Sequence, residues 1–580
     1  LDPMLSAIWP DPHDKEKRGP ITRALDRFNR WFDRMTDRYT AVIAWALDHR
    51  WWMVAIIVIA FFGAIMLQAT VGGSSFVPDT DNSELTITVE TAPGSTLVYT
   101  REKTEEISTI ARQHPEVIYS YGTVGSSDGS GTVDSGSIYL KLKPKKERTK
   151  SQQQIAAELR EQLRNVAGAN AYIAGSGPGG GGGKQLQIQV RGDDLKNLNL
   201  SAVQLMNAIR SVPGATDVGL STRGERPELK VNLDRSLAAT LGFSPADVAN
   251  ALRSGFAGVK AGDWVDPTGR TRDVTVRLTP SERQSQSDVA DLPLISRTAV
   301  AATTTAAAAP ANAVIPVGQV AAITKDQGPT SIDHYNRDKI ITVGANVQGR
   351  PLGAVLADIQ GKIKAVKLPA GVFVTQGGQA ESQSEVFGGI LSALLLAVML
   401  MYFILVVQFG SFLDPIAILI SLPLSLIGVV LALIVTHDTL NLMSLIGVML
   451  LMGIVAKNAI LLIDFAKWNH EAGKPLREAL IEAGRVRLRP ILMTTFALIA
   501  GMLPVAIGAG EGGDFRAPLG RAVIGGTITS TFLTLLVIPT VYEILSEWRE
   551  GIGRMMRRIF GRKPVNAPAS SSLNNEAQTR

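Results

Sequence analysis

A single lysine lies inside one of the most apolar stretches of the sequence. Residues 450–465 read LLMGIVAKNAILLIDF, and thirteen of them are apolar or glycine. A lysine at the centre of a bilayer costs about 2.5–3.5 kcal/mol on insertion scales, so such residues usually face the protein interior and mark a functional site. The alternative for Lys457 is that its long side chain reaches the membrane surface. It lies eight residues from the end of the stretch, near the limit of that reach.

The other two polar residues of this stretch have more than one interpretation. Asp464 follows Lys457 by seven residues, which places it two helical turns away on roughly the same face and too far for a direct ion pair. We interpret Asp464 as a carboxylate at the membrane surface. Asn458 either lines the same interior as Lys457 or hydrogen-bonds a neighbouring helix.

A second polar pair opens the next apolar stretch, RVRLRPILMTTFALIAGMLP (485–504). Arg487 and Thr494 are seven residues apart, so they share one helix face. Thr494 lies at a depth where its hydroxyl could meet the Lys457 ammonium, although threonines in membrane helices often bond their own backbone. Arg485 and Arg489 fit the general excess of basic residues beside cytoplasmic helix ends.

A lysine in a medium of low dielectric constant needs an anionic partner or loses its proton, so its charge is coupled to that of nearby carboxylates. This is the chemistry of a proton relay. No acidic residue lies at the middle of any apolar run of this sequence. We therefore expect the counter-charge to come from outside these 580 residues.

The elements that position these residues are membrane helices. Six runs are long enough to cross a bilayer, at 51–69, 386–408, 415–436, 443–465, 490–509 and 519–545. Nine lysines and arginines lie in 10–50 and six in 466–489, whereas the turns 437–441 and 509–514 have none. The basic segments therefore face the cytoplasm, and the long block 70–385 lies on the opposite side.

The net charge of +6 and the pI near 9.3 come largely from the segments beside the membrane. We interpret these segments, including the tail 546–580, as contacts with lipid head groups rather than with nucleic acid. Within 10–50, apolar residues recur at three- and four-residue steps, which predicts an amphipathic helix along the cytoplasmic membrane surface. A helix of a soluble bundle is the alternative. The absence of cysteine excludes disulfides and thiolate metal sites within the sequence.

The outer block alternates strands and helices. Its first unit has predicted strands at 84–90, 116–124, 137–143 and 170–177 and helices near 95–113 and 151–166, an order typical of a split βαβ sandwich of ferredoxin-like type. A second such unit uses strands at 186–191, 228–234, 339–347 and 371–378 with helices at 199–212 and 351–366. An insert, 236–338, separates its halves.

Two low-complexity segments punctuate this block. GSGPGGGGGK (175–184) lacks the spacing of a phosphate-binding loop and is predicted to be a hinge between the two units. The Ala- and Thr-rich segment 298–313 is predicted to be a flexible loop.

Several stretches, in this order, resemble the resistance-nodulation-division (RND) efflux transporters, especially the hydrophobe/amphiphile pumps. They are FVPDTDNSELTITVETAPGST (76–96), LDRSLAATLGFSPADVANALR (233–253), GIVAKNAILLIDFAK (453–467), RVRLRPILMTTFALIAGMLP (485–504) and PLGRAVIGGTITSTFLTLLVIPTVYEIL (518–545). The resemblance extends to about residue 550. It implies the second half of a twelve-span fold, with a membrane bundle of six helices and a periplasmic α+β domain of ferredoxin-like subdomains.

The resemblance also implies a division of the chain. Residues 1–9 end a preceding span, 10–50 form the connecting surface helix, and 51–69 form the first of six spans, the other five lying in 386–545. The periplasmic block, 70–385, contains a first porter subdomain, a second porter subdomain and a docking insert, which correspond to 80–178, to 185–235 with 339–380, and to 236–338.

The family's proton relay gives roles to the polar membrane residues. A lysine, a threonine and an arginine of that relay match Lys457, Thr494 and Arg487, and its two aspartates would lie in a missing N-terminal six-span half. The resemblance implies no cofactor, because the proton gradient supplies the energy. It implies a homotrimer in the bacterial inner membrane that works with a periplasmic adaptor protein and an outer-membrane channel.

The cargo is less closely defined. Multidrug members line a deep pocket with phenylalanines on strands that match 116–124 and 137–143, where this sequence has Tyr119, Tyr121 and Tyr139. These tyrosines favour a more polar cargo, although aromatic residues on such strands are often part of the core. Metal export is not expected, because the outer block has one methionine, Met206, and no cysteine.

The sequence therefore predicts a secondary transporter, not an enzyme, that exports amphiphilic small molecules. Export of lipids or cell-envelope components is one alternative. A non-transporting half that lacks the proton-binding aspartates is another.

Overall fold

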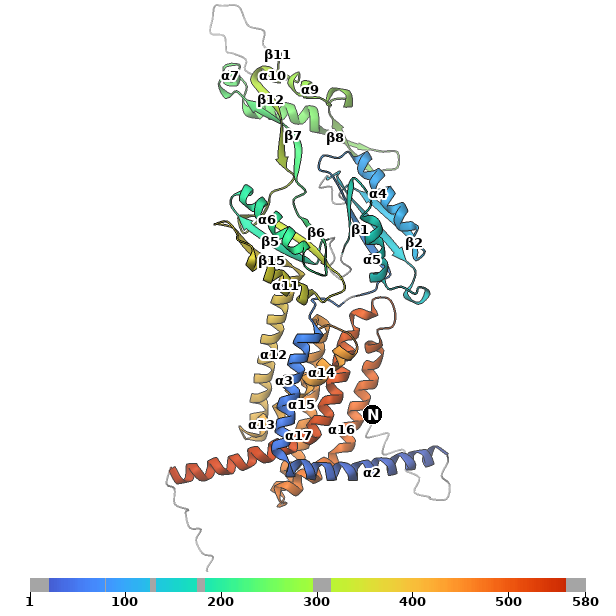
Figure 1. Cartoon of the computed structure of the whole chain (residues 1–580), viewed down its shortest axis with the longest axis vertical. Helices are drawn as coiled ribbons and strands as arrows, with labels where there is room; N and C mark the ends of the chain where they lie inside the picture. The colour runs from blue at the N-terminus through green and yellow to red at the C-terminus, as the bar shows by residue number, and fades with distance from the viewer. Residues whose placement is uncertain (1–19, 79, 126–131, 175–182, 296–313, 560–580) are drawn as a thin grey trace, which may run out of the picture.

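The computed structural model describes the chain from 20 to 559, apart from 79, 126–131, 175–182 and 296–313 (Figure 1). Three predicted segments fall wholly or mostly outside the described residues: the end of a preceding span at 1–9, the Gly-rich hinge at 175–184 and the loop at 298–313. The same holds for most of the basic tail beyond 546.

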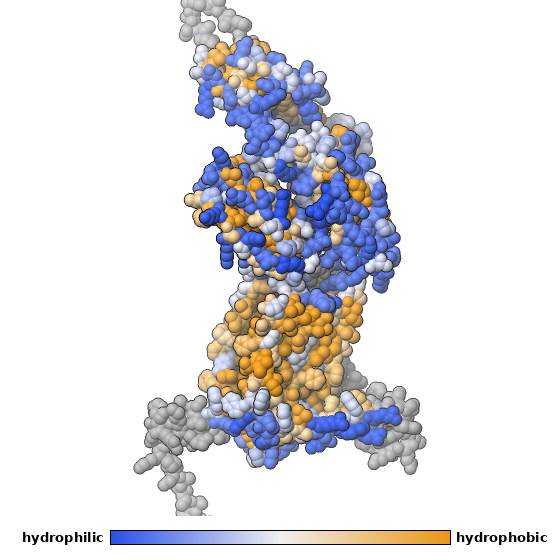
Figure 2. All heavy atoms as spheres, in the orientation of Figure 1, coloured by the Kyte–Doolittle hydropathy of each residue, from blue (hydrophilic) through white to orange (hydrophobic). Residues whose placement is uncertain are grey.

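Six helical segments are long and apolar enough to cross a membrane, as the sequence predicts. They form one bundle with an apolar surface (Figures 1 and 2). They are α3 (Arg50–Leu67) with the following turn Gln68–Gly72, α12 (Gln379–Phe409), α13 (Asp414–Leu419) with α14 (Ser421–Val435), α15 (Leu442–Glu471), α16 (Leu476–Ile507) and α17 (Ala517–Ile559). Helix α16 begins well before the apolar run at 490, because residues 476–489 are rich in alanine, leucine, glutamate and arginine, which favour helix.

Glycine residues allow the helices of this bundle to pack closely. Helix α17 contacts α14, α15 and α16, and a Cβ atom on Gly428 of α14 would lie only 2.3 Å from the carbonyl oxygen of Gly525 in α17. Such glycines let two helix backbones approach closely, which is the main source of packing in a membrane interior. Helices α3 and α12 contain few buried residues, so they lie at the edge of the bundle.

Helix α2 (Pro20–Asp48) lies across the end of the bundle that is opposite the outer block (Figure 1). Its apolar face covers that end, with Phe32 and Ile43 buried. Tyr39 donates a hydrogen bond to the carbonyl of Leu535 in α17, at 2.9 Å. This helix therefore closes one end of the membrane bundle.

The first α/β unit follows α3. Its elements are β1 (Glu84–Thr91), α4 (Leu97–Arg112), β2 (Val117–Val124), β3 (Ser135–Leu142), α5 (Gln152–Leu163) and β4 (Ala169–Ile173). The sheet order is β2-β3-β1-β4, and all pairs are antiparallel. Alternate residues of β1 are buried against the two helices, and the other face of the sheet lies away from this core.

The second α/β unit has the same plan. It consists of β5 (Leu186–Gly192), α6 (Leu195–Arg210), β6 (Ala215–Leu220), β14 (Asp338–Val347), α11 (Leu352–Ala365) and β15 (Phe373–Gly378), with β13 (Asp333–Tyr335) added beside β14. Strand β14 lies between β5 and β6, and β15 pairs with β5. The prediction that 228–234 is a strand of this unit is wrong, because β6 takes that place.

The predicted strand at 228–234 belongs instead to a two-stranded ribbon that leads to the insert. Strand β7 (Glu225–Leu233) pairs along nine residues with β12 (Ala321–Pro329). Most side chains of β7 are exposed, as expected for a strand in a two-stranded ribbon, which has little core to bury them. At its far end the insert has its own small core. The elements there are α7 (Arg235–Thr240), α8 (Pro245–Leu252), β8 (Val259–Val265), β9 (Thr271–Val276), α9 (Gln286–Ala290), β10 (Pro293–Ile295), β11 (Val314–Pro316) and α10 (Val317–Val320).

Candidate functional site

Lys457 lies on the face of α15 that the other described helices leave uncovered. Exposed residues recur along this face at three-, four- and seven-residue steps, at Ile446, Leu450, Gly453, Lys457 and Asp464. The opposite face is buried in the bundle through Leu451, Val455 and Leu462. Among the described residues, none forms a hydrogen bond or ion pair with the Lys457 side chain. The ammonium group is therefore at the surface of this six-helix bundle and not enclosed by it.

A contact between Arg487 and Phe465 shows how α15 and α16 are aligned along their axes. Its guanidinium lies over the ring of Phe465 in α15, 4.8 Å from the ring centre. Counting outward from this contact, Lys457 is eight residues along α15, about 12 Å, and Thr494 is seven residues along α16, about 10 Å. The two helices run in opposite directions, so Lys457 and Thr494 lie at nearly the same depth.

The three candidate relay residues differ in their surroundings. Thr494 is exposed, and its hydroxyl donates to the carbonyl of Ile491 in its own helix, at 3.0 Å. Arg487 is half-buried, and its Nε atom is buried without a hydrogen-bond acceptor among the described residues. Asp464 is exposed near the end of α15, whereas Asn458 is buried among the helices. Two of the three relay candidates therefore present polar atoms on an open side of the bundle.

The three candidate tyrosines lie far from the membrane, on the first sheet. Tyr121 and Tyr139 are opposite each other in the pairing of β2 and β3, and the rings of Tyr119 and Tyr139 are 6.3 Å apart. Tyr119 is 51% exposed and Tyr121 67% exposed. The neighbouring residues Ile138 and Leu140, which point to the other face, are completely buried. The tyrosines therefore lie on the open face of the sheet and outside its core.

A carboxylate accompanies these rings. The hydroxyl of Tyr139 donates to Oε2 of Glu84 at 2.8 Å. This hydrogen bond, together with partial burial, raises the pKa of Tyr139 to about 12, so the phenol stays protonated at neutral pH. The open face thus combines flat aromatic surface with an acceptor for positive or hydrogen-bonding groups.

A cavity of about 390 Å³ lies between the two α/β units, beside the outer end of the membrane bundle. The first unit lines it through Gln153, Ala156 and Ile173, and the second through Val347 and Leu352. From the membrane side it is bordered by Ser75, Gln379 and Thr439. Its lining mixes amide and hydroxyl groups and two arginines, Arg160 and Arg350, with apolar side chains, which suits an amphiphilic molecule.

A polar network joins the two units beside this cavity, and we call it the cleft latch. Arg160 of α5 donates to Asp217 of β6 at 3.0 Å and to Gln348 at 2.7 Å. The amide of Asn346 donates to Asp217 and to the carbonyl of Ile173, each at 2.9 Å. The Asp217 side chain is 9% exposed and Asn346 is buried, whereas Gln348 is exposed, so the centre of the network is shielded from solvent and its edge is not.

The sequence analysis did not identify the cleft latch. Its residues come from α5, β6 and β14, which are separated by more than fifty residues along the chain. In the structure Asp217 has a φ of 53°, a conformation that aspartate tolerates better than most residues. No local sequence pattern indicates the contact between the two units.

The chain spans about half the length of the relatives that it matches. It is 29% identical to the multidrug resistance protein MdtC of Erwinia tasmaniensis (strain DSM 17950 / CFBP 7177 / CIP 109463 / NCPPB 4357 / Et1/99) over 555 residues, which are 95% of this chain and 52% of that protein. Crystal forms I and II of a heavy metal efflux pump superpose with TM-scores of 0.71 and 0.72, at 26% identity, over 88% of this chain and 52% of those chains. The model of the AcrB/AcrD/AcrF family matches residues 1–546. The chain therefore belongs to the AcrB/AcrD/AcrF family, in agreement with its resemblance to RND transporters.

Proposed function

We propose that this chain is the C-terminal half of a proton-driven RND efflux transporter that exports amphiphilic small molecules. The observation that carries the proposal is Lys457. It is a charged residue in a membrane helix, it lies on an open face, and no described residue pairs with it. A charge in that position needs a partner in low-dielectric surroundings, and a second six-span half would supply one.

In this proposal, two aspartates of the N-terminal half hold the Lys457 ammonium while they are ionised. When protons neutralise those carboxylates, Lys457 loses its partners and turns to Thr494, which lies at the same depth on α16. Arg487, with its unpartnered Nε, takes part in the same network. The resulting change in the packing of α15 against α16 is the step that couples protons to movement.

The outer block would carry the cargo. We propose that the two α/β units are ferredoxin-like porter subdomains and that the insert is the docking domain for an adaptor protein and an outer-membrane channel. The cavity beside the membrane would admit an amphiphile from the periplasm or the outer leaflet. The open sheet face with Tyr119, Tyr121 and Tyr139 would contact it further along the route.

The names of the relatives favour different cargoes, since one is a multidrug resistance protein and the solved structures are two crystal forms of a heavy metal efflux pump. The tyrosine face and the amide-lined cavity support an organic amphiphile. Export of a lipid or another envelope component uses the same surfaces. A protection assay in cells that lack other pumps separates these cargoes, because only a drug exporter restores growth in the presence of the compounds.

The relay is tested by the substitution Lys457→Ala in the complete gene product. Because the ammonium is the switching charge, we expect proton-coupled efflux to be lost while membrane insertion and assembly are retained. Uptake of a fluorescent amphiphile into cells, with and without a proton gradient, measures the effect. Met449→Ala is the matched control, since Met449 is an exposed apolar residue on the same helix.

Two outcomes would contradict parts of this proposal. Efflux at the wild-type rate in the Lys457→Ala variant removes the relay assignment. DNA sequencing immediately upstream tests the half-transporter assignment, because an in-frame six-span segment with two intramembrane aspartates supports it and a stop codon supports a non-transporting half.

A further inference from the structure

The two α/β units are attached to the membrane bundle in different ways. Strand β15 of the second unit continues directly into α12. The backbone of Gly353 in α11 donates to the carbonyl of Ser74 at 2.8 Å, and Ser74 forms a bridge with Leu440 in the turn between α14 and α15. The second unit is thus joined to α12 and to the α14–α15 turn through the backbone.

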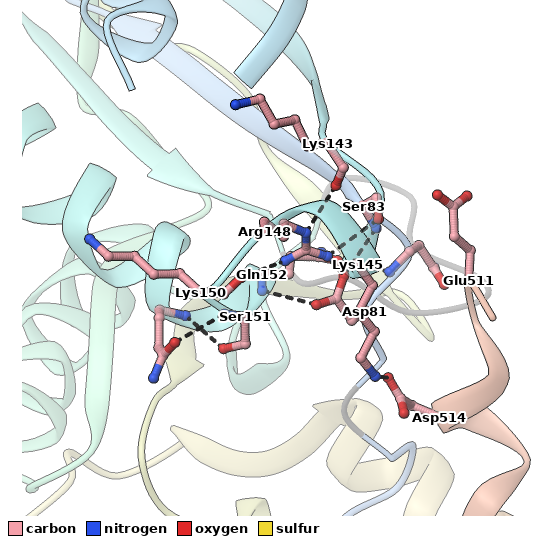
Figure 3. A network of polar contacts seen from close by, with 12 residues as sticks. Asp81, Ser83, Lys143, Lys145, Arg148, Lys150, Ser151, Gln152, Glu511 and Asp514 are labelled. Carbon is pink, nitrogen blue, oxygen red and sulfur yellow. Dashed lines mark hydrogen bonds and ion pairs between the residues drawn. The ribbon is translucent and has the colours of Figure 1, made fainter. Parts of the chain in front are cut away.

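The first unit contacts a different part of the bundle. Lys145 forms an ion pair with Asp514 at 2.6 Å, and Lys141 lies 3.9 Å from Glu511. Both carboxylates belong to the turn 508–516, which connects α16 to α17. The backbone of Gly512 in this turn also donates to the carbonyl of Asp81 at 3.3 Å. We call these three contacts the outer joint, and Figure 3 shows Lys145, Glu511 and Asp514 of this joint.

The side of the joint that belongs to the first unit is firmly held (Figure 3). Arg148 is 1% exposed and pairs with Asp81. Asp81 also accepts hydrogen bonds from the backbone of Ser83 and Gln152, each at 3.1 Å. Arg148 donates to the carbonyls of Lys143 and Lys150 at 3.0 and 2.9 Å. The loop that carries Lys145 is therefore fixed to β1 and α5, and it moves with the whole unit.

The other side of the joint is the outer end of α16. This helix carries Arg487 and Thr494, and it ends at Ile507, directly before the turn with Glu511 and Asp514. A tilt or shift of α16 moves these two carboxylates. The second unit continues into α12, which does not carry the turn 508–516, although Arg521 of α17 also links the carbonyl of Ala506 in α16, at 3.0 Å, to Asp438 in the α14–α15 turn, at 2.8 Å.

We infer that the outer joint transmits the motion of α16 to the first α/β unit and so sets the width of the cavity between the two units. The cavity is closed when the cleft latch is formed, since Arg160 and Asp217 come from opposite units. This inference rests on the proposed function, in which protons act at the level of Thr494. It adds the route by which that event reaches the cargo.

Charge reversal tests the joint in the complete gene product, reconstituted in liposomes. The readout is the amount of rhodamine 6G moved per proton, measured with the dye and an internal pH indicator. Lys145→Glu and Asp514→Lys are each expected to lower this ratio about fivefold or more, the usual range for loss of coupling between sites. The double swap is expected to restore it to within about twofold. Lys146→Glu is the control, because Lys146 is an exposed neighbour that forms no ion pair in the described structure.

A distance measurement tests the joint without transport. Spin labels at Gln153→Cys and Lys362→Cys, both exposed, report the separation of the first and second units. Lys145→Glu is expected to broaden the distance distribution, and Lys146→Glu is expected to leave it unchanged. These 580 residues contain no cysteine, so only cysteines in the remainder of the complete gene product need to be replaced by serine before labelling.

The outcomes separate the two claims. If the wild type moves no dye and no protons, the proposed function fails. The spin-label distances then test the role of the outer joint by themselves. If the wild type transports but the single reversals keep its ratio, or the double swap is no better than they are, the joint is overturned. Equal distance distributions for Lys145→Glu and Lys146→Glu also overturn it. Size-exclusion profiles verify that each variant is folded.

Discussion

The hydroxyl of Tyr139 donates to Glu84 on a sheet face that the hydrophobic core leaves open. Tyr121 lies beside it with two thirds of its surface exposed, and it is not part of the hydrophobic core that the described residues of the first unit form. The sequence placed these tyrosines on the correct strands, but it did not show which face they occupy. The register of β2 against β3 decides that, and register depends on pairing across a loop.

The substitution Tyr121→Ala tests the role of this face. Because the ring packs against no core, we expect the free energy of unfolding to change by less than about 0.5 kcal/mol, while the range of compounds against which the transporter protects cells changes. Growth in a panel of amphiphilic compounds measures the effect. Ile118→Ala is the control on the same strand. Unchanged susceptibility to every compound would argue against a cargo-contacting role.

Elements with strong patterns were predictable, and those with weak patterns were not. The apolar runs predicted all six membrane segments, because length and hydropathy alone decide them. Strand β6, ATDVGL, contains small and polar residues and follows a Pro-Gly turn, so it gave no strand pattern. Strand β7 alternates clearly, yet it leaves the sheet to pair with β12, nearly ninety residues further along the chain. Local sequence does not determine strand pairing over such distances.

Close packing of α14 against α17 provides a prediction for the bundle. Gly428→Ala places a Cβ atom against the backbone of Gly525 and should destabilise the protein by about 1–3 kcal/mol, as overpacking does. Gly388→Ala in α12 has open space around it and should have little effect. The temperature of half-unfolding in detergent compares the two variants. A lower value for Gly388→Ala than for Gly428→Ala would contradict the close approach.

At the scale of the molecule, the chain has a polar outer block, an apolar bundle and a hydrophilic opposite end (Figure 2), and the segments at that end are rich in lysine and arginine. The distribution of lysine and arginine predicts that the basic end faces the cytoplasm. The cleft latch and the outer joint were not predictable, because each joins residues that only the complete fold brings together. The uncovered face of α15 was likewise not predictable, because it depends on how the six helices pack together.

The orientation is testable with single cysteines in this cysteine-free sequence. Trp264→Cys in the insert should react with a membrane-impermeant maleimide in spheroplasts, because the insert lies outside the membrane. Lys474→Cys, between α15 and α16, should react only after the membrane is opened. Labelling of Lys474→Cys in sealed spheroplasts would reverse the orientation.

The ribbon of β7 and β12 has a mechanical consequence. Nine paired residues at about 3.3 Å each give a stalk of roughly 30 Å. Two hydrogen-bonded strands twist and bend with little resistance, but they barely stretch. The length of the stalk is thus nearly fixed while the tilt of the small head beyond it varies, so any companion that binds the head must accommodate that tilt.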